Sequence, residues 1–188
     1  MAIGILGRKL GMTHILNEQG NPVPVTVIEA PPCPIVQIKN KQRDGYSALQ
    51  IAFQKRGKDI KKELRITSQE ESEFQEGHLL KADIFKVGDY VKVVGVSKGK
   101  GFQGGVKRWG WRGGPKTHGS MSHRRVGSIG ASSDPSRVLK GQHLPGRMGN
   151  AKTTIKNLRV MKVDVENNIL CIKGGVPGSR NSILLIKT

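Results

Sequence analysis

The sequence predicts a mainly β protein, a small antiparallel barrel or sandwich interrupted by one long basic segment. Three observations lead to this prediction. Apolar and β-branched residues alternate with polar ones on both sides of the middle of the chain, as in half-buried strands. Clusters of turn-forming residues separate these runs. Residues 97–160 hold 14 of the 32 Lys and Arg residues but only one of the 14 acidic residues, Asp134.

The N-terminal half contains the first predicted strands. Residues 12–30 form a predicted hairpin, because valines alternate with other residues after the turn cluster at 17–21. Pro31-Pro32 then interrupts the chain before a strand at 35–39. Apolar and polar residues alternate again over 49–54, which predicts a further strand.

The rest of the flanking sequence continues this pattern with one exception. Residues 59–75 have a helical composition with poor apolar spacing, so we expect a short helix or a charged loop there. Residues 90–96 are rich in valine and predict a strand. Strands at 163–165 and 170–172 flank Asn167-Asn168, which suits a two-residue hairpin turn. A last strand is expected at 182–186, giving seven to nine short strands in all.

Composition divides the chain into two parts. Residues 1–96 and 161–188 are predicted to fold together into one β-barrel body. Residues 97–160 contain 13 of the 25 glycines, both tryptophans and a large excess of cations, so they predict a long extended arm with its tip at about 139–150. The whole chain carries a net charge of +18 and has a pI of about 10.3. This excess predicts a polyanionic partner.

Several classes of protein are excluded by simple features of the sequence. No apolar run approaches the ~18 residues of a membrane helix, and the N-terminus does not have the order of a signal peptide. Two distant cysteines suit a reducing compartment, so we expect a cytoplasmic location. Close Cys and His spacing is missing, so we expect no metal site and no cofactor. We also expect no membrane partner and no small-molecule substrate.

One short motif could bind a nucleotide. Residues Gly99–Gly104 match the pattern G-x-G-x-x-G after a predicted strand. However, no amphipathic helix follows, and no acid lies about 20 residues further on to hold a ribose. The glycines instead suit a loop whose backbone approaches phosphates.

Residues Lys107–Arg112 interleave cations with two indole rings. Arginine can bind phosphate in a bidentate manner, and indoles can stack on unpaired bases. Packing of at least one tryptophan within the segment is the alternative. The histidines, serines and Asp134 nearby lack a nucleophile elbow, so we expect no catalytic site here.

A string of motifs along the whole chain resembles one known family, the large-subunit ribosomal proteins of the L3 family in their bacterial form. The motifs that carry the resemblance are GRKLGMT at 7–13, SKGKGF at 97–102, KRW at 107–109, THG at 117–119, SHR at 122–124, GSIG at 127–130, GRMGN at 146–150 and KGGVPG at 173–178. One departure is Arg147, which stands where some relatives carry a methylated glutamine.

The resemblance implies a translation-protein-type β-barrel and an arm that enters the large-subunit rRNA toward the peptidyl transferase centre. It implies a structural component of the ribosome without enzymatic activity, which binds near the 3′ end of that rRNA and assists subunit assembly. The implied neighbours are proteins of the L14 and L19 families.

The residues and the resemblance together predict a set of rRNA contacts, consisting of cations, rings and one amide. They are Arg8, Lys9, Lys98, Lys100, Phe102, Lys107, Arg108, Trp109, Trp111, Arg112, Lys116, His118, His123, Arg124, Arg125, Arg137, Lys140, His143, Arg147, Asn150, Lys152 and Lys156.

Two other functions compete with this interpretation. A nucleotide-dependent or RNA-modifying enzyme would use the loop at 99–104 and would bind nucleotide as the purified chain. A protein that compacts nucleic acid without sequence preference would bind duplex DNA and rRNA fragments equally well at moderate salt.

Overall fold

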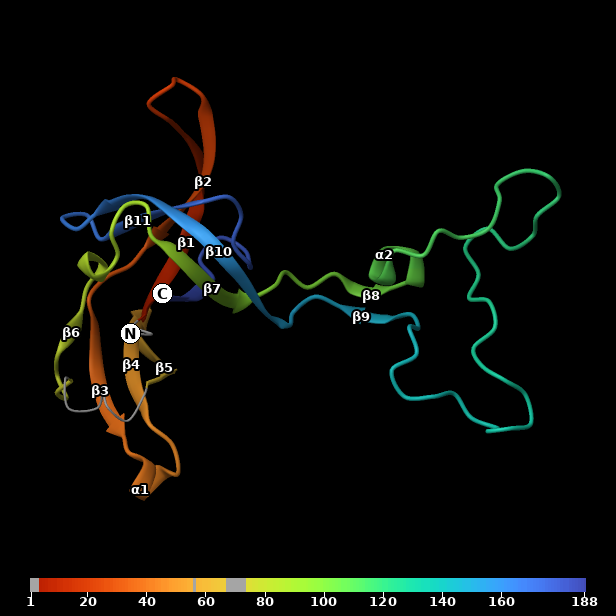
Figure 1. Cartoon of the computed structure of the whole chain (residues 1–188), viewed down its shortest axis with the longest axis horizontal. Coiled ribbons are helices and arrows are strands. Elements are labelled where there is room, and N and C mark those ends of the chain that lie inside the picture. The colour runs from red at the N-terminus through yellow and green to blue at the C-terminus, as the bar shows by residue number, and fades with distance from the viewer. Residues whose placement is uncertain (1–3, 56, 67–73) are drawn as a thin grey trace. The chain divides into compact units, whose positions relative to one another are not determined.

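The computed structural model describes residues 4–55, 57–66 and 74–188 (Figure 1). The protein is mainly β, with antiparallel sheets, as the alternation in the sequence predicts. Contacts divide the chain into two compact units, residues 1–97 with 152–188 and residues 98–151. Among the described residues, no helix has the length and apolar character needed to cross a membrane.

Six strands of the first unit pair in a closed cycle, each with two antiparallel neighbours. In the order of pairing they are β1 (Gly4–Leu16), β12 (Ile183–Lys187), β7 (Tyr90–Val96), β10 (Lys152–Asp164), β11 (Ile169–Lys173) and β2 (Pro22–Glu29). The strand near the C-terminus therefore lies between the first strand and β7. The predicted hairpin at 12–30 is confirmed as β1 and β2, whose turn is held by the Asn17 side chain.

A second, four-stranded sheet belongs to the same unit. Its order is β5 (Lys58–Arg65), β4 (Ala48–Lys55), β3 (Cys33–Lys39) and β6 (Leu79–Leu80). A single turn of helix, α1 (Lys41–Asp44), connects β3 to β4 and ends at Gly45 in the left-handed conformation. The short 3₁₀ helix η2 (Ala82–Ile84) lies between β6 and β7. These strands confirm the predictions at 35–39 and 49–54.

The core of the first unit forms because alternate side chains of the strands point inward. On β12, Leu184 and Ile186 are fully buried while their neighbours are half-buried. The same hydrophobic cluster includes Ile5 from β1 and Ile51 and Leu64 from the second sheet. Burying each such side chain contributes about 1.5–3 kcal/mol, so this cluster is the main source of stability for the unit.

The structure corrects the prediction for residues 59–75. Residues 58–65 form the edge strand β5, which pairs with β4 so that Leu64 lies opposite Leu49. The charged residues of this segment are typical of a helix, but charged residues also commonly protect an exposed sheet edge from pairing with another chain. Residues 67–73 lie outside the described part of the chain.

Two further boundaries differ from the prediction. The composition predicts that residues 152–160 belong to the basic arm, but they lie in β10, which pairs with β7 from Lys152 opposite Val96 to Arg159 opposite Tyr90. Their lysines gave them the composition of the arm, whereas the buried Val160 belongs to the core. The hairpin between β10 and β11 is confirmed, but its loop has four residues and only Asn168 is left-handed, at φ 54°.

The structure also corrects the prediction that Lys9 contacts rRNA, because its side chain is buried. Its ammonium group donates hydrogen bonds to the carbonyl oxygens of Val176, at 3.0 Å, and Gly178, at 3.2 Å. The backbone of Lys9 bonds the same loop through Asn181 and Ser182. Lys9 therefore fastens the loop that precedes β12 onto β1.

Replacing Lys9 with methionine should destabilise the protein by about 1–3 kcal/mol, because the carbonyl groups of the loop lose a buried donor. The free energy of unfolding from urea titration measures this change. Lys173→Met is the control, since Lys173 is exposed on β11. Equal stability of the two variants would contradict a structural role for Lys9.

Candidate nucleic-acid interface

The unit at residues 98–151 is built on a small ladder and one short helix. Strand β8 (Gly101–Gln103) pairs with β9 (Gly146–Met148), so that Phe102 lies opposite Arg147. The helix α2 (Gly105–Trp109) follows β8 and ends at Gly110 in the left-handed conformation. The ladder brings together two segments that are more than 40 residues apart in sequence (Figure 1).

This ladder corrects the expected position of the tip. The sequence predicts that the chain reverses at about 139–150, but residues 146–148 already pair with β8. The amide of Lys100 also donates to the carbonyl of Met148 at 2.9 Å. Gly149 has φ +72°, and a β-carbon there would collide with the carbonyl oxygen of Lys98. The reversal of this segment therefore lies before residue 146.

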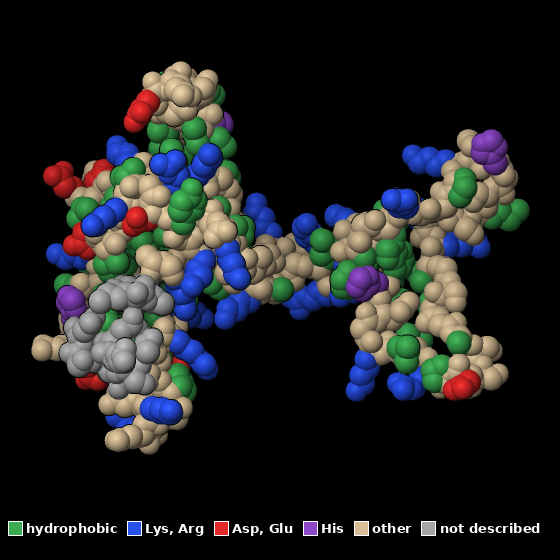
Figure 2. Space-filling view, viewed as in Figure 1, with side chains coloured by type: hydrophobic (Ala, Val, Ile, Leu, Met, Phe, Trp, Pro, Cys, Tyr) green, Lys and Arg blue, Asp and Glu red, His purple; other side chains and the backbone are tan. Residues whose placement is uncertain are grey.

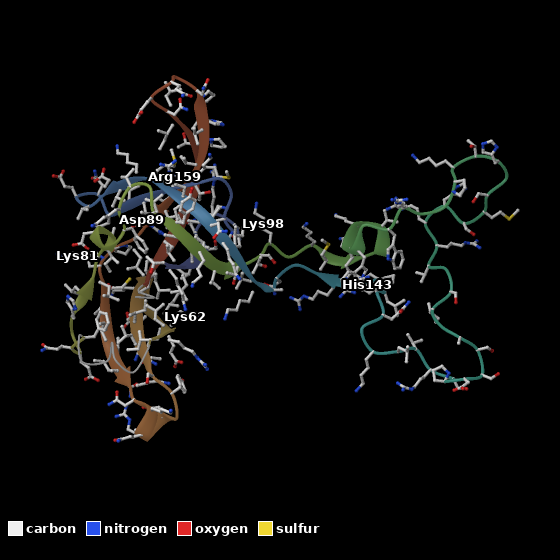
Figure 3. The ribbon with its side chains drawn as sticks, viewed as in Figure 1. Lys62, Lys81, Asp89, Lys98, His143 and Arg159 are labelled. Atoms are coloured by element: carbon white, nitrogen blue, oxygen red, sulfur yellow. The ribbon has the colours of Figure 1, made fainter. Side chains whose placement is uncertain are left out.

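Trp109 connects α2 to the returning chain. Its indole stacks on the imidazole of His143, with ring centroids 4.0 Å apart and planes 5° from parallel. The indole N–H donates to the carbonyl of Leu144 at 2.9 Å, and the guanidinium of Arg108 donates to the same oxygen at 2.7 Å. His143 is labelled beside α2 in Figure 3. Two predicted contact residues, Trp109 and Arg108, thus hold the unit together.

Trp111 packs within the unit as well. Its ring lies directly over Gly105, so closely that any β-carbon at Gly105 would overlap it. Gly105 is buried and Trp111 is half-buried. Packing of the tryptophans inside the segment, the alternative to base stacking, therefore accounts for both rings, although Trp109 remains 41% exposed.

A second close approach of two chain segments lies at His123, which contacts residues 113–115. The amide of Gly114 donates to the carbonyl of His123 at 3.0 Å, and the Nδ1 atom of His123 lies 2.8 Å from the carbonyl oxygen of Pro115. A β-carbon at Gly113 would press on the same His123 carbonyl, so the two chain segments approach closely because of these glycines.

Most predicted contact residues of this unit are exposed to solvent. Arg108 and Trp111 are half-buried, whereas the exposed ones are Lys98, Lys100, Phe102, Lys107, Trp109, Arg112, Lys116, His118, His123, Arg124, Arg125, Arg137, Lys140, His143, Arg147 and Asn150. Asp134 is the only acidic residue between 98 and 151. The charged side chains on the surface of this unit are accordingly almost all cations (Figure 2).

The remaining predicted residues lie in the first unit. Lys152 and Lys156 are exposed on β10. Arg8 forms an ion pair with Glu29, and the Nε–Oε2 distance is 2.6 Å, so its charge is already partly balanced. Arg8 and Lys9 are therefore weaker candidates for rRNA contact than the cations of residues 98–151.

The geometry does not favour a nucleotide site at Gly99–Gly104. These residues enter the two-stranded ladder, and the helix after them has only five residues. A dinucleotide site needs a full strand–helix–strand unit. Within the described ranges, no group of His, Cys, Asp or Glu side chains could hold a metal ion.

Sequence reasoning missed the carbonyl of Leu144 as an organising group. It accepts hydrogen bonds from two side chains that lie 35 and 36 residues earlier in the chain. A backbone carbonyl has no signature in a sequence. The sequence predicts Leu144-Pro145 only as part of the tip of the arm at about 139–150.

A mainly β unit joined to a cation-dense unit with a single acid defines a protein that binds nucleic acid. Comparison with known families identifies the family within this class. The family model described as ribosomal protein L3 matches residues 46–167. This match spans more than half of the chain and crosses both units. The chain therefore belongs to the ribosomal protein L3 family, whose members are structural proteins of the large ribosomal subunit.

Proposed function

We propose that this protein binds the rRNA of the large subunit chiefly through residues 98–151, as a structural constituent without enzymatic activity. One observation carries the proposal. The unit has almost no acids, and its cations are exposed to solvent. Only a few residues stabilise it, namely Trp109, His143 and those of the β8–β9 ladder. Such a surface neutralises phosphates and releases their counterions.

The two units then have different tasks. The first unit, a barrel of the type found in translation proteins, sets the position on the rRNA surface near its 3′ end. Residues 98–151 enter between rRNA helices as an arm and fix their packing, which assists assembly of the subunit. The arm is directed toward the peptidyl transferase centre. Proteins of the L14 and L19 families are the neighbours of this protein in the large subunit. The ribosome that contains it works in the cytoplasm.

Sedimentation of the tagged full chain through a high-salt gradient tests this function. The chain should co-migrate with the large subunit, and RNase treatment should release it, because the association depends on phosphate contacts. A chain that stays at the top of the gradient, or remains bound after complete digestion of the RNA, would contradict the proposal.

A further inference from the structure

A groove in the first unit gathers cations of which only one, Lys152, is among the rRNA contacts predicted from the sequence. It is a cavity of about 930 Å³ between the outer faces of β7 and β12 and the edge strand β5. Its apolar surface includes Val94 and Leu185, which are directly opposite each other in the β7–β12 pair. We call this cavity the β5 groove.

Cations from three separate strands line this groove. They are Lys61, Lys62 and Arg65 on β5, Lys152 on β10 and Lys187 on β12. Lys62 is labelled on β5 in Figure 3, and Figure 2 shows Lys and Arg side chains clustered on this side of the first unit. Because the strands are distant in sequence, only the fold brings these charges together.

The arrangement is unfavourable for the protein alone. Lys187 lies directly opposite Lys92 in the β7–β12 register, and like charges in such a pair destabilise a sheet. Burial lowers the pKa of the Lys187 ammonium group, and the nearby charges of Lys92 and Lys152 lower the pKa further. An anion in the groove would relieve this repulsion.

Among the described residues, little negative charge lines the groove. Glu63 is the one carboxylate that the described part of the chain places in the lining. It already accepts from the Lys39 ammonium at 2.8 Å and from the Tyr46 hydroxyl at 2.8 Å. These bonds hold the pKa of Glu63 below its usual range, so the carboxylate is ionised but engaged with Lys39 of β3 and with Tyr46. Within the described part of the chain, Glu63 therefore does not neutralise the lysines of the groove, which suit an external anion.

We propose that the β5 groove binds the phosphodiester backbone of RNA, as a second contact separate from residues 98–151. The volume is that of a pocket for a ligand larger than one phosphate ion. Its apolar surface suits a ribose, and the surrounding lysines suit the phosphates of a backbone that runs along the groove. The proposal rests on the proposed rRNA-binding function, because the same RNA would supply both contacts.

Lysine labelling of the full chain, read by mass spectrometry, tests the two contacts separately. The chain is labelled alone, with a large-subunit rRNA fragment, and with inorganic phosphate. The rRNA should reduce labelling of Lys62, Lys152 and Lys187 several-fold, while the exposed Lys81 and Lys86 react as before.

Each outcome decides something different. Protection of Lys107 and Lys116 without protection of the groove lysines would overturn this proposal and leave the proposed function standing. No protection at either place would count against both. Protection by inorganic phosphate as strong as that by rRNA would make the groove a site for free anions, which also overturns the proposal.

A charge-matched pair of triple variants gives an independent measurement. Lys62→Gln, Lys152→Gln and Lys187→Gln together should lower the slope of log affinity against log salt by about two, at ~0.7 per lost contact to single-stranded RNA. The control changes Lys81, Lys86 and Lys173, which are exposed elsewhere on the first unit. The groove variant should also melt at a higher temperature than the control, since it removes mutual repulsion. Equal salt slopes for the two variants would overturn the proposal.

Discussion

Replacing Lys107, Arg112 and Arg124 with glutamine should weaken binding to a large-subunit rRNA fragment roughly a hundredfold at 0.15 M salt. All three side chains are exposed. Three lost phosphate contacts should also lower the slope of log affinity against log salt by about two to three. Filter binding over a series of salt concentrations measures both quantities. Arg108 is left unchanged, because its bond to Leu144 supports the structure of the unit.

The triple change at Lys81, Lys86 and Lys173 again serves as the control, because it removes the same charge from the first unit. It separates local phosphate contacts from the effect of net charge on association. If both triple variants lost affinity to the same extent, residues 98–151 would have no special part in binding.

Replacing Gly105 with alanine should disrupt the unit at 98–151 and thereby its affinity for rRNA. The added methyl group would overlap the Trp111 ring, so α2 and the ring must separate. Overpacking of this kind costs about 1–3 kcal/mol, which is large for a unit with so few buried side chains. Tryptophan fluorescence measures the change selectively, because both tryptophans of the protein, Trp109 and Trp111, lie in this unit.

Gly104→Ala is the matched control for this substitution. It lies one residue earlier, at φ −70°, and a β-carbon there has no neighbour within 4 Å. The two variants have the same composition and charge, so a difference between them reports the contact with Trp111. Identical fluorescence and rRNA affinity would refute the packing described for Gly105.

Most strands could be predicted from the sequence because their apolar residues alternate. β7 and β12 each bury alternate side chains, and this pattern is local. β5 could not be predicted in the same way, because Ile60 and Leu64 are its only apolar residues between lysines and acids. Its strand conformation depends on pairing with β4, and composition alone does not reveal a partner.

The sequence predicts the excess of cations in the basic interface, but it does not predict which residues pack together to form its structure. The excess of cations over acids in residues 98–151 is read directly from the sequence. Stacking of Trp109 on His143 joins residues 34 positions apart, and the burial of Lys9 depends on carbonyls near residue 177. Contacts over such separations are set by the fold, so a ring or a lysine that looks like an RNA contact can be a structural residue instead.

The position of β12 in the strand cycle determines the order in which a growing chain can acquire its structure. β1 is synthesised before the other strands of the cycle, yet one of its edges has no partner until residues 183–187 follow. The same residues supply the second edge of β7. The β8–β9 ladder, complete once residue 148 has been made, can close before the cycle of the first unit does. The β8–β9 ladder can therefore form while the cycle of the first unit is still open, and that cycle closes only after residues 183–187 have been made.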